Sequence, residues 1–135
     1  MAARRLEPFP SIIPRPGDTP ALWQYVYEVM GSDLPPEDAS PQARLLRFTQ
    51  EFAPACNAVD PTTCEIQLEI WHMTEVAVAE RRHTRARPRD LNGAVIVVLY
   101  SGGRFLVDGC NRVNSWLRHG NQEFHNVVVI RHHGP

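Results

Sequence analysis

The sequence Phe105-Leu-Val-Asp-Gly-Cys-Asn-Arg112 reads as a β-strand that enters an α-helix through a single glycine. Apolar residues lead up to Asp108, and after Gly109 the apolar residues Val113 and Trp116 follow at helical spacing. A glycine at such a junction permits a sharp turn and a close approach of another group to the backbone. This stretch therefore predicts a sheet with a helix packed against it.

The segments on either side of this junction supply three more strands. Residues 64–70 alternate strictly between apolar and polar, which is typical of a half-buried strand. The continuous apolar run at 94–100 indicates a central strand covered on both faces. Residues 101–103 are Ser-Gly-Gly, so the strand over 104–108 should pair back as a hairpin. With a final strand over 126–130 and a short helix after the first strand, the predicted order is β–α–β–β–α–β.

The short helix is predicted to run from Thr74, as a cap, to Arg82.

The N-terminal half has a different composition, because ten of the twelve prolines lie at or before residue 61. Residues 1–18 are predicted to form an extended arm. Two helices should follow, because Thr19-Pro20 and Ser40-Pro41 each resemble an N-cap followed by proline at the first helical position.

These patterns divide the chain into a proline-rich arm with a helical extension, residues 1–60, and an α+β domain, residues 61–135. The length of 135 residues suits one compact unit, and 43% apolar residues can fill one modest core. No apolar run approaches the roughly 20 residues that span a bilayer, so we expect no membrane partner. Charged and proline residues interrupt residues 1–10, so no secretory signal is expected.

The three cysteines include no CxxC pair, and they predict neither a disulfide framework nor a zinc site. The six histidines show no metal-ligand spacing either, so no metal site is assigned to the protein's own side chains. Because few cysteines and no secretory signal are typical of a reducing compartment, we expect a cytoplasmic location. The formal net charge of −1 argues against a globally basic nucleic-acid binder and leaves room for a local basic patch.

All 14 basic residues are arginine, a bias that a coding preference explains by itself. Five of them crowd residues 81–89, where Arg85 and Arg87 lie near the middle. Arginine's planar fork binds phosphate in a bidentate manner, which lysine does not do. This stretch is therefore interpreted as a solvated loop, a triphosphate clamp or a contact to a nucleic-acid backbone.

The helix start after Gly109 is the second candidate. Free backbone N–H groups and the positive end of the helix dipole favour an anion there, typically a phosphate. Asn111 is predicted to cap the helix, and Arg112 to bind phosphate oxygens. The same dipole and Arg112 favour a thiolate at Cys110, which predicts a nucleophile, while Asp108 is within reach of a metal or a substrate hydroxyl. The simpler alternatives are an Arg112–Asp108 ion pair and a Cys110 that only packs.

Residues 94–130 resemble the ParB/sulfiredoxin superfamily. Its members have a hydrophobic strand, a glycine-containing turn, a second strand ending in an Asp-Gly-x-x-Arg-like motif, a helix, a glycine and a final strand. The motif here is Asp108-Gly-Cys-Asn-Arg112. The sulfiredoxin branch carries Gly-Cys-His-Arg, so Cys110 and Arg112 match while Asn111 replaces histidine. The partition-protein branch usually has two small residues soon after the arginine, which Asn114-Ser115 fits loosely.

The resemblance implies a small mixed sheet with helices, and ATP or CTP bound at the helix start, with or without Mg²⁺. In the sulfiredoxin branch the cysteine acts on a phosphorylated sulfinic acid. If the protein is an enzyme, phosphoryl transfer or hydrolysis is the expected reaction, working by positioning and charge stabilisation. Two residues are then catalytic, Cys110 and Asp108, and the remaining ones hold the nucleotide: Gly109, Asn111, Arg112, Arg85 and Arg87.

Two other functions fit the same sequence. In the first, the protein is a non-catalytic nucleic-acid-binding module that uses the arginines of 81–89. In the second, it is a protein-interaction or effector domain in which residues 1–60 contact a partner protein. Nucleic-acid binding would weaken steeply with salt, and a nucleotide bound in a built site would persist. The oligomeric state is left open by the sequence.

Overall fold

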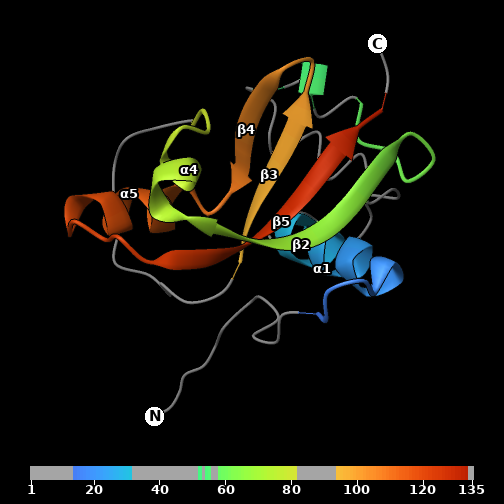
Figure 1. Ribbon diagram of the computed structural model, residues 1–135. Helices are drawn as coiled ribbons and strands as arrows, with labels where there is room; N and C mark the ends of the chain where they lie inside the picture. The colour runs from blue at the N-terminus through green and yellow to red at the C-terminus, as the bar shows by residue number, and fades with distance from the viewer. Residues whose placement is uncertain (1–13, 32–51, 53, 56–57, 82–93, 134–135) are drawn as a thin grey trace.

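The computed structural model describes residues 14–31, 52, 54–55, 58–81 and 94–133. In these ranges the protein is a mixed α+β structure with one four-stranded sheet (Figure 1). This confirms the α+β class. The elements, in chain order, are α1 (Thr19–Gly31), β2 (Cys64–His72), α4 (Met73–Ala77), β3 (Val95–Tyr100), β4 (Gly103–Asp108), α5 (Cys110–Arg118) and β5 (Phe124–His132).

The sheet has the strand order β2-β5-β3-β4. β2 pairs with β5 and β3 pairs with β4 in antiparallel fashion, whereas β3 and β5 are parallel. The order β–α–β–β–α–β predicted for this half of the chain is confirmed. Because β5 comes last in this series and yet lies in the middle, the sheet is completed by a strand that is inserted between two earlier ones.

The two central strands are buried on both faces. The four residues 95–98 of β3 and the four residues 127–130 of β5 are at most 1% exposed. All eight are valine or isoleucine, whose branched side chains pack well on a pleated surface. The prediction of a central strand covered on both sides is therefore confirmed, and it holds for β5 as well as for β3.

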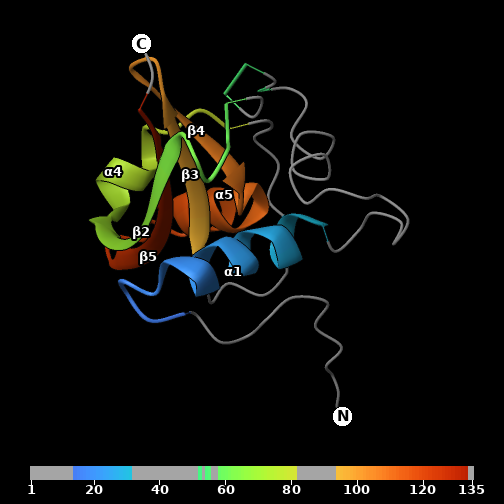
Figure 2. The same cartoon turned by 90° about the vertical axis from the view of Figure 1, so that its right-hand side faces the viewer.

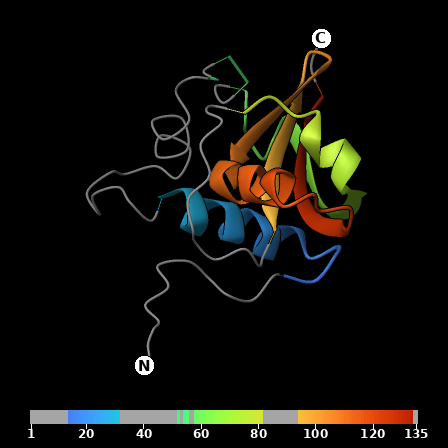
Figure 3. The ribbon, with the colours of Figure 1, turned by 90° about the vertical axis from the view of Figure 1, so that its left-hand side faces the viewer.

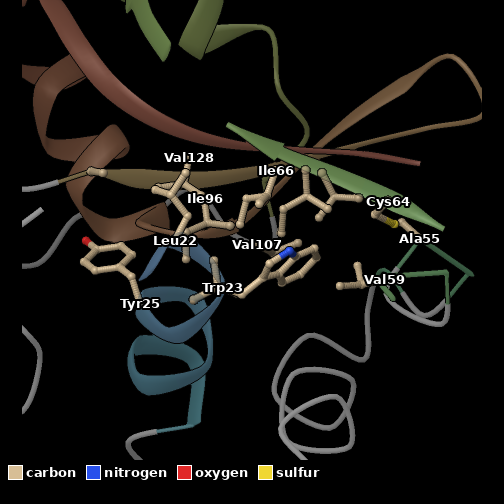
Figure 4. Close-up of a cluster of buried hydrophobic side chains, with 14 residues drawn as sticks. Leu22, Trp23, Tyr25, Ala55, Val59, Cys64, Ile66, Ile96, Val107 and Val128 are labelled. Carbon is tan, nitrogen blue, oxygen red and sulfur yellow. The ribbon is translucent and has the colours of Figure 1, made fainter. Parts of the chain in front are cut away.

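Helices cover the two faces of the sheet. α1 packs on one face, and α4 and α5 pack on the other (Figures 2 and 3). Leu22 and Trp23 extend from α1 towards the sheet, where they join a buried cluster that includes Ile66, Ile96 and Val107 (Figure 4). Burying each large apolar side chain stabilises the fold by about 2 kcal/mol. α1 thus shares a core with the sheet.

The short helix differs from its predicted bounds. It runs over Met73–Ala77, and its N-cap is His72, whose ring accepts a hydrogen bond from the Thr74 backbone N–H at 3.2 Å. Thr74 is therefore not the cap. After the helix, the backbone N–H of Glu80 donates to the carbonyl of Arg104 at 2.9 Å, so the chain pairs with β4 before residue 82.

The N-terminal predictions are tested only in part. The predicted helix that begins at Thr19 is confirmed as α1. Residues 1–13 of the predicted arm, and most of the second predicted helix, over residues 40–54, lie outside the described residues. The division of the chain at residue 60 stays a prediction. Within the described ranges, no helix is long and apolar enough to cross a bilayer.

Candidate functional site

The junction between β4 and α5 depends on Gly109. Its φ of 99° lies in the left-handed region, and a Cβ atom there would lie 2.6 Å from Cγ1 of Val95. Only glycine fits both conditions. Gly109 is the N-cap of α5, so the prediction that Asn111 caps this helix is wrong; Asn111 lies inside the first turn. A glycine N-cap has no side chain that accepts hydrogen bonds from the first amides of the helix.

Arg112 links the first turn of α5 to the entrance of β3. Its Nη1 atom donates a hydrogen bond of 2.8 Å to the carbonyl oxygen of Ala94. The guanidinium group lies close to Gly109, since Nη1 is 3.4 Å from the place where a Cβ of that glycine would be. A guanidinium carries five N–H groups. The bond to Ala94 fixes the position of the fork beside the helix start.

A second arginine binds the same helix one turn further on. The Nε atom of Arg81 donates to Oδ1 of Asn114 at 2.8 Å, and its Nη1 atom donates to the carbonyl of Ala77 at 3.1 Å. Arg81 and Ala94 flank residues 82–93, which we call the arginine segment because it contains Arg82, Arg85, Arg87 and Arg89. Both flanking residues are thus hydrogen-bonded to α5.

The two candidate sites found in the sequence, the start of α5 and the arginine segment, are therefore linked by hydrogen bonds between α5 and the residues that flank the segment. Arg112 and Asn114 of α5 contact the two residues that flank the arginine segment, Ala94 and Arg81. Arg85 and Arg87 themselves lie outside the described residues. The sequence did not reveal Asn114 as an anchor, although its spacing of four residues from Cys110 places both side chains on one face of the helix.

Asn111 carries an unsatisfied polar atom. Its Oδ1 atom is buried and accepts no hydrogen bond from any residue that the structure describes. Leaving a buried acceptor unpaired costs about 1–3 kcal/mol. A group that donates a hydrogen bond at this position would recover part of that free energy.

The two residues predicted to be catalytic have different surroundings. Cys110 is 3% exposed and belongs to the apolar cluster between α5 and the sheet. The Nδ2 atom of Asn114 donates to its sulfur at 3.6 Å. Asp108 is half-buried at the end of β4, opposite Ile96. The structure tests neither catalytic role, so both stay predictions.

Among the residues that the structure describes, no three His, Cys, Asp or Glu side chains are grouped closely enough to hold a metal ion. Comparisons of the chain with family models, with curated proteins and with solved structures find no match. The site is therefore interpreted from its own geometry.

Proposed function

We propose that the protein binds a nucleotide or another phosphorylated ligand at the start of α5, on a ParB/sulfiredoxin-like scaffold. The observation that carries this proposal is the pair of hydrogen bonds from Arg112 to Ala94 and from Arg81 to Asn114. They tie Arg81 and Ala94, the two residues that flank the arginine segment, to the first two turns of a helix whose N-terminus favours anions. A ligand with several phosphates would be recognised by both parts.

Each residue at the helix start has a role in this proposal. Gly109 lets the chain turn into the helix against Val95, the first backbone N–H groups of α5 would bind phosphate oxygens, and the Arg112 fork would bind further ones. The buried Oδ1 of Asn111, which accepts no hydrogen bond from the described residues, would accept one from a donor on the ligand. A ribose hydroxyl, the exocyclic amine of adenine or cytosine, or a water bound to Mg²⁺ each supply one. ATP and CTP each carry such donors, and so does inorganic phosphate at neutral pH, where it keeps at least one P–OH group.

A reaction at the site would be phosphoryl transfer or hydrolysis, in which positioning and charge stabilisation dominate. Asp108 would then hold Mg²⁺ or a substrate hydroxyl at the end of β4. Cys110 would act as a nucleophile only after its thiol, 3% exposed here, becomes accessible. Alkylation of Cys110 that is slowed by bound nucleotide, and that abolishes turnover, would support this role.

Calorimetric titration with ATP, CTP and inorganic phosphate tests the binding proposal. The matched variants are Arg112→Ala and Arg118→Ala, which remove the same side chain from the first and the last turn of α5. We expect Arg112→Ala to weaken nucleotide binding at least tenfold and Arg118→Ala, at an exposed position, to leave it unchanged. Arg112→Lys keeps the charge and loses the fork, so it should fall between them.

An unchanged affinity in a folded Arg112→Ala protein contradicts the proposal, as does a wild-type protein that binds none of the three ligands. Thermal unfolding with ligand at 100 times its Kd gives an independent readout, because such binding stabilises the folded state by about 2.7 kcal/mol.

Binding and co-purification experiments with the same protein distinguish the two alternative functions. If the arginines bind a nucleic-acid backbone, affinity for DNA or RNA should fall by orders of magnitude between 50 and 200 mM salt, roughly as expected for several phosphate contacts. Nucleotide binding that persists at 200 mM salt favours the proposed site. Co-purification with one partner protein, with no nucleotide bound, favours the interaction domain.

A further inference from the structure

A pocket of about 830 Å³ lies at the other end of α5. Ten residues line it, from the last turn of the helix through the turn that follows to the first residues of β5. Its volume falls within the roughly 300–1,000 Å³ typical of small-ligand sites. A helix of nine residues is about 13 Å long, so this pocket is separate from the site at Gly109.

Hydrogen bonds fix the proton positions of two histidines in this pocket. The Nδ1 atom of His119 lies 2.8 Å from the carbonyl oxygen of Ser115, which only accepts, so Nδ1 carries the proton. The Oδ1 atom of Asn121 accepts from the Glu123 backbone N–H at 2.8 Å and lies 2.8 Å from Nε2 of His125. Nε2 of His125 is therefore the donor. In their neutral forms, the rings keep Nε2 of His119 and Nδ1 of His125 as acceptors.

His125 is held in its neutral form by its surroundings. Its ring stacks on Trp116 with centroids 3.7 Å apart and planes 15° apart. Burial lowers the pKa of His125 because it disfavours the imidazolium, the nearby His72 lowers this pKa further, and Glu123 opposes the shift. At neutral pH this ring is thus a hydrogen-bond acceptor.

The described lining of the pocket carries a negative charge when its histidines are neutral. Glu123 is then the one formally charged residue among the ten that line it. The carboxyl end of α5 adds the negative end of the helix dipole. Arg118, in the last turn, does not line the pocket. Phe124, which is 67% exposed, adds an aromatic ring of the kind that attracts cations.

We propose that this pocket binds an organic cation that carries a guanidinium or primary ammonium group. Glu123 pairs with the cationic group, the acceptor nitrogens of His119 and His125 take its N–H donors, and Phe124 packs against its aliphatic stem. The ligand is either a free amine or an arginine or lysine side chain of a partner, since both present the same chemistry.

Titration of the ¹⁵N-labelled full chain, followed by NMR, tests this site. The probes are arginine amide, its neutral analogue citrulline amide, spermidine and an acetylated peptide with a single arginine. We expect arginine amide to shift the resonances of residues 115–126, and citrulline amide, which has a similar shape without the charge, to leave them unchanged. Equal shifts with both compounds, or no shift with any probe at 10 mM, overturn the proposal.

The matched variants are Glu123→Gln and Glu65→Gln. The first removes the charge of the pocket, and the second removes that of an exposed glutamate on β2 that does not line it. Glu123→Gln should weaken arginine amide binding at least tenfold and Glu65→Gln less than twofold; equal weakening in both contradicts a specific site. Tighter binding of the peptide than of the free amines identifies a protein side chain as the ligand, and the reverse order identifies a small amine.

Discussion

The two ends of α5 differ in how completely their polar groups are satisfied. At the start, the N-cap is a glycine and the buried Oδ1 of Asn111 accepts no hydrogen bond from the described residues. At the other end, Oδ1 of Asn121 lies 2.8 Å from two donors and the His119 ring holds the carbonyl of Ser115. The difference indicates that hydrogen bonds within the described residues preorganise the second end, whereas they leave one buried acceptor at the first end without a donor.

The largest expected effect is the difference in stability loss between alanine substitutions of the glycines at the two ends of α5. Gly109 and Gly120 both have positive φ, at 99° and 70°, but a Cβ at Gly120 would meet nothing within 4 Å. Gly120→Ala should therefore cost about 1 kcal/mol of backbone strain. Gly109→Ala adds a clash with Val95 and should cost about 3 kcal/mol in all. Urea denaturation measures both; equal losses would mean that the contact with Val95 relaxes without cost.

The two asparagines should respond with opposite signs. Asn121→Ala removes the acceptor of two hydrogen bonds and should lower the free energy of unfolding by about 2 kcal/mol. Asn111→Ala removes a buried oxygen that the described residues leave without a donor and introduces a better helix former, so it should raise stability by up to about 1 kcal/mol. Denaturation of both variants without ligand tests this pair. A destabilised Asn111→Ala protein would show that Oδ1 already has a partner, such as an ordered water.

The smallest expected effect concerns pH. Because the pKa of His125 is lowered in the folded state, the unfolded chain binds more protons in the window just below pH 6.5, and stability falls as the pH drops through that window. The start of α5, residues 108–114, contains no histidine. His125→Gln should therefore flatten this part of the stability profile, as measured by thermal unfolding between pH 5 and 7. A slope that persists in this variant would assign the effect to another histidine.

The strands were predictable because their signal is local. The alternation in residues 64–70 and the apolar run in 94–100 gave strands in the right places. The prediction missed the end of β2 and the start of β5. There His72 and Phe124 stand opposite each other as the last pair of the ladder. Neither residue fits the periodic pattern of its strand, and pairing across the sheet extends β2 by two residues at one end and β5 by two residues at each end.

The candidate site was predictable only as separate parts. The strand–glycine–helix junction is visible in the sequence, but the bond from Arg112 to Ala94 joins residues 18 positions apart and that from Arg81 to Asn114 joins residues 33 apart. No periodicity reports such contacts. The assignment of Asn111 as a cap failed because asparagine favours that position only when the preceding backbone permits it, and the contact with Val95 requires glycine at the N-cap.

The insertion of β5 between β2 and β3 has a consequence for the order of folding. The β3–β4 hairpin closes locally, but β2 has no neighbour in the sheet until residues 124–132 arrive. Such non-local pairing is slow, and during synthesis residues 64–72 emerge well before the strand that pairs with them. Glu65 and Glu69 lie within β2, where charges discourage pairing with other chains. The two glutamates thus act at two stages, because in the folded sheet Glu69 also forms an ion pair with Arg131.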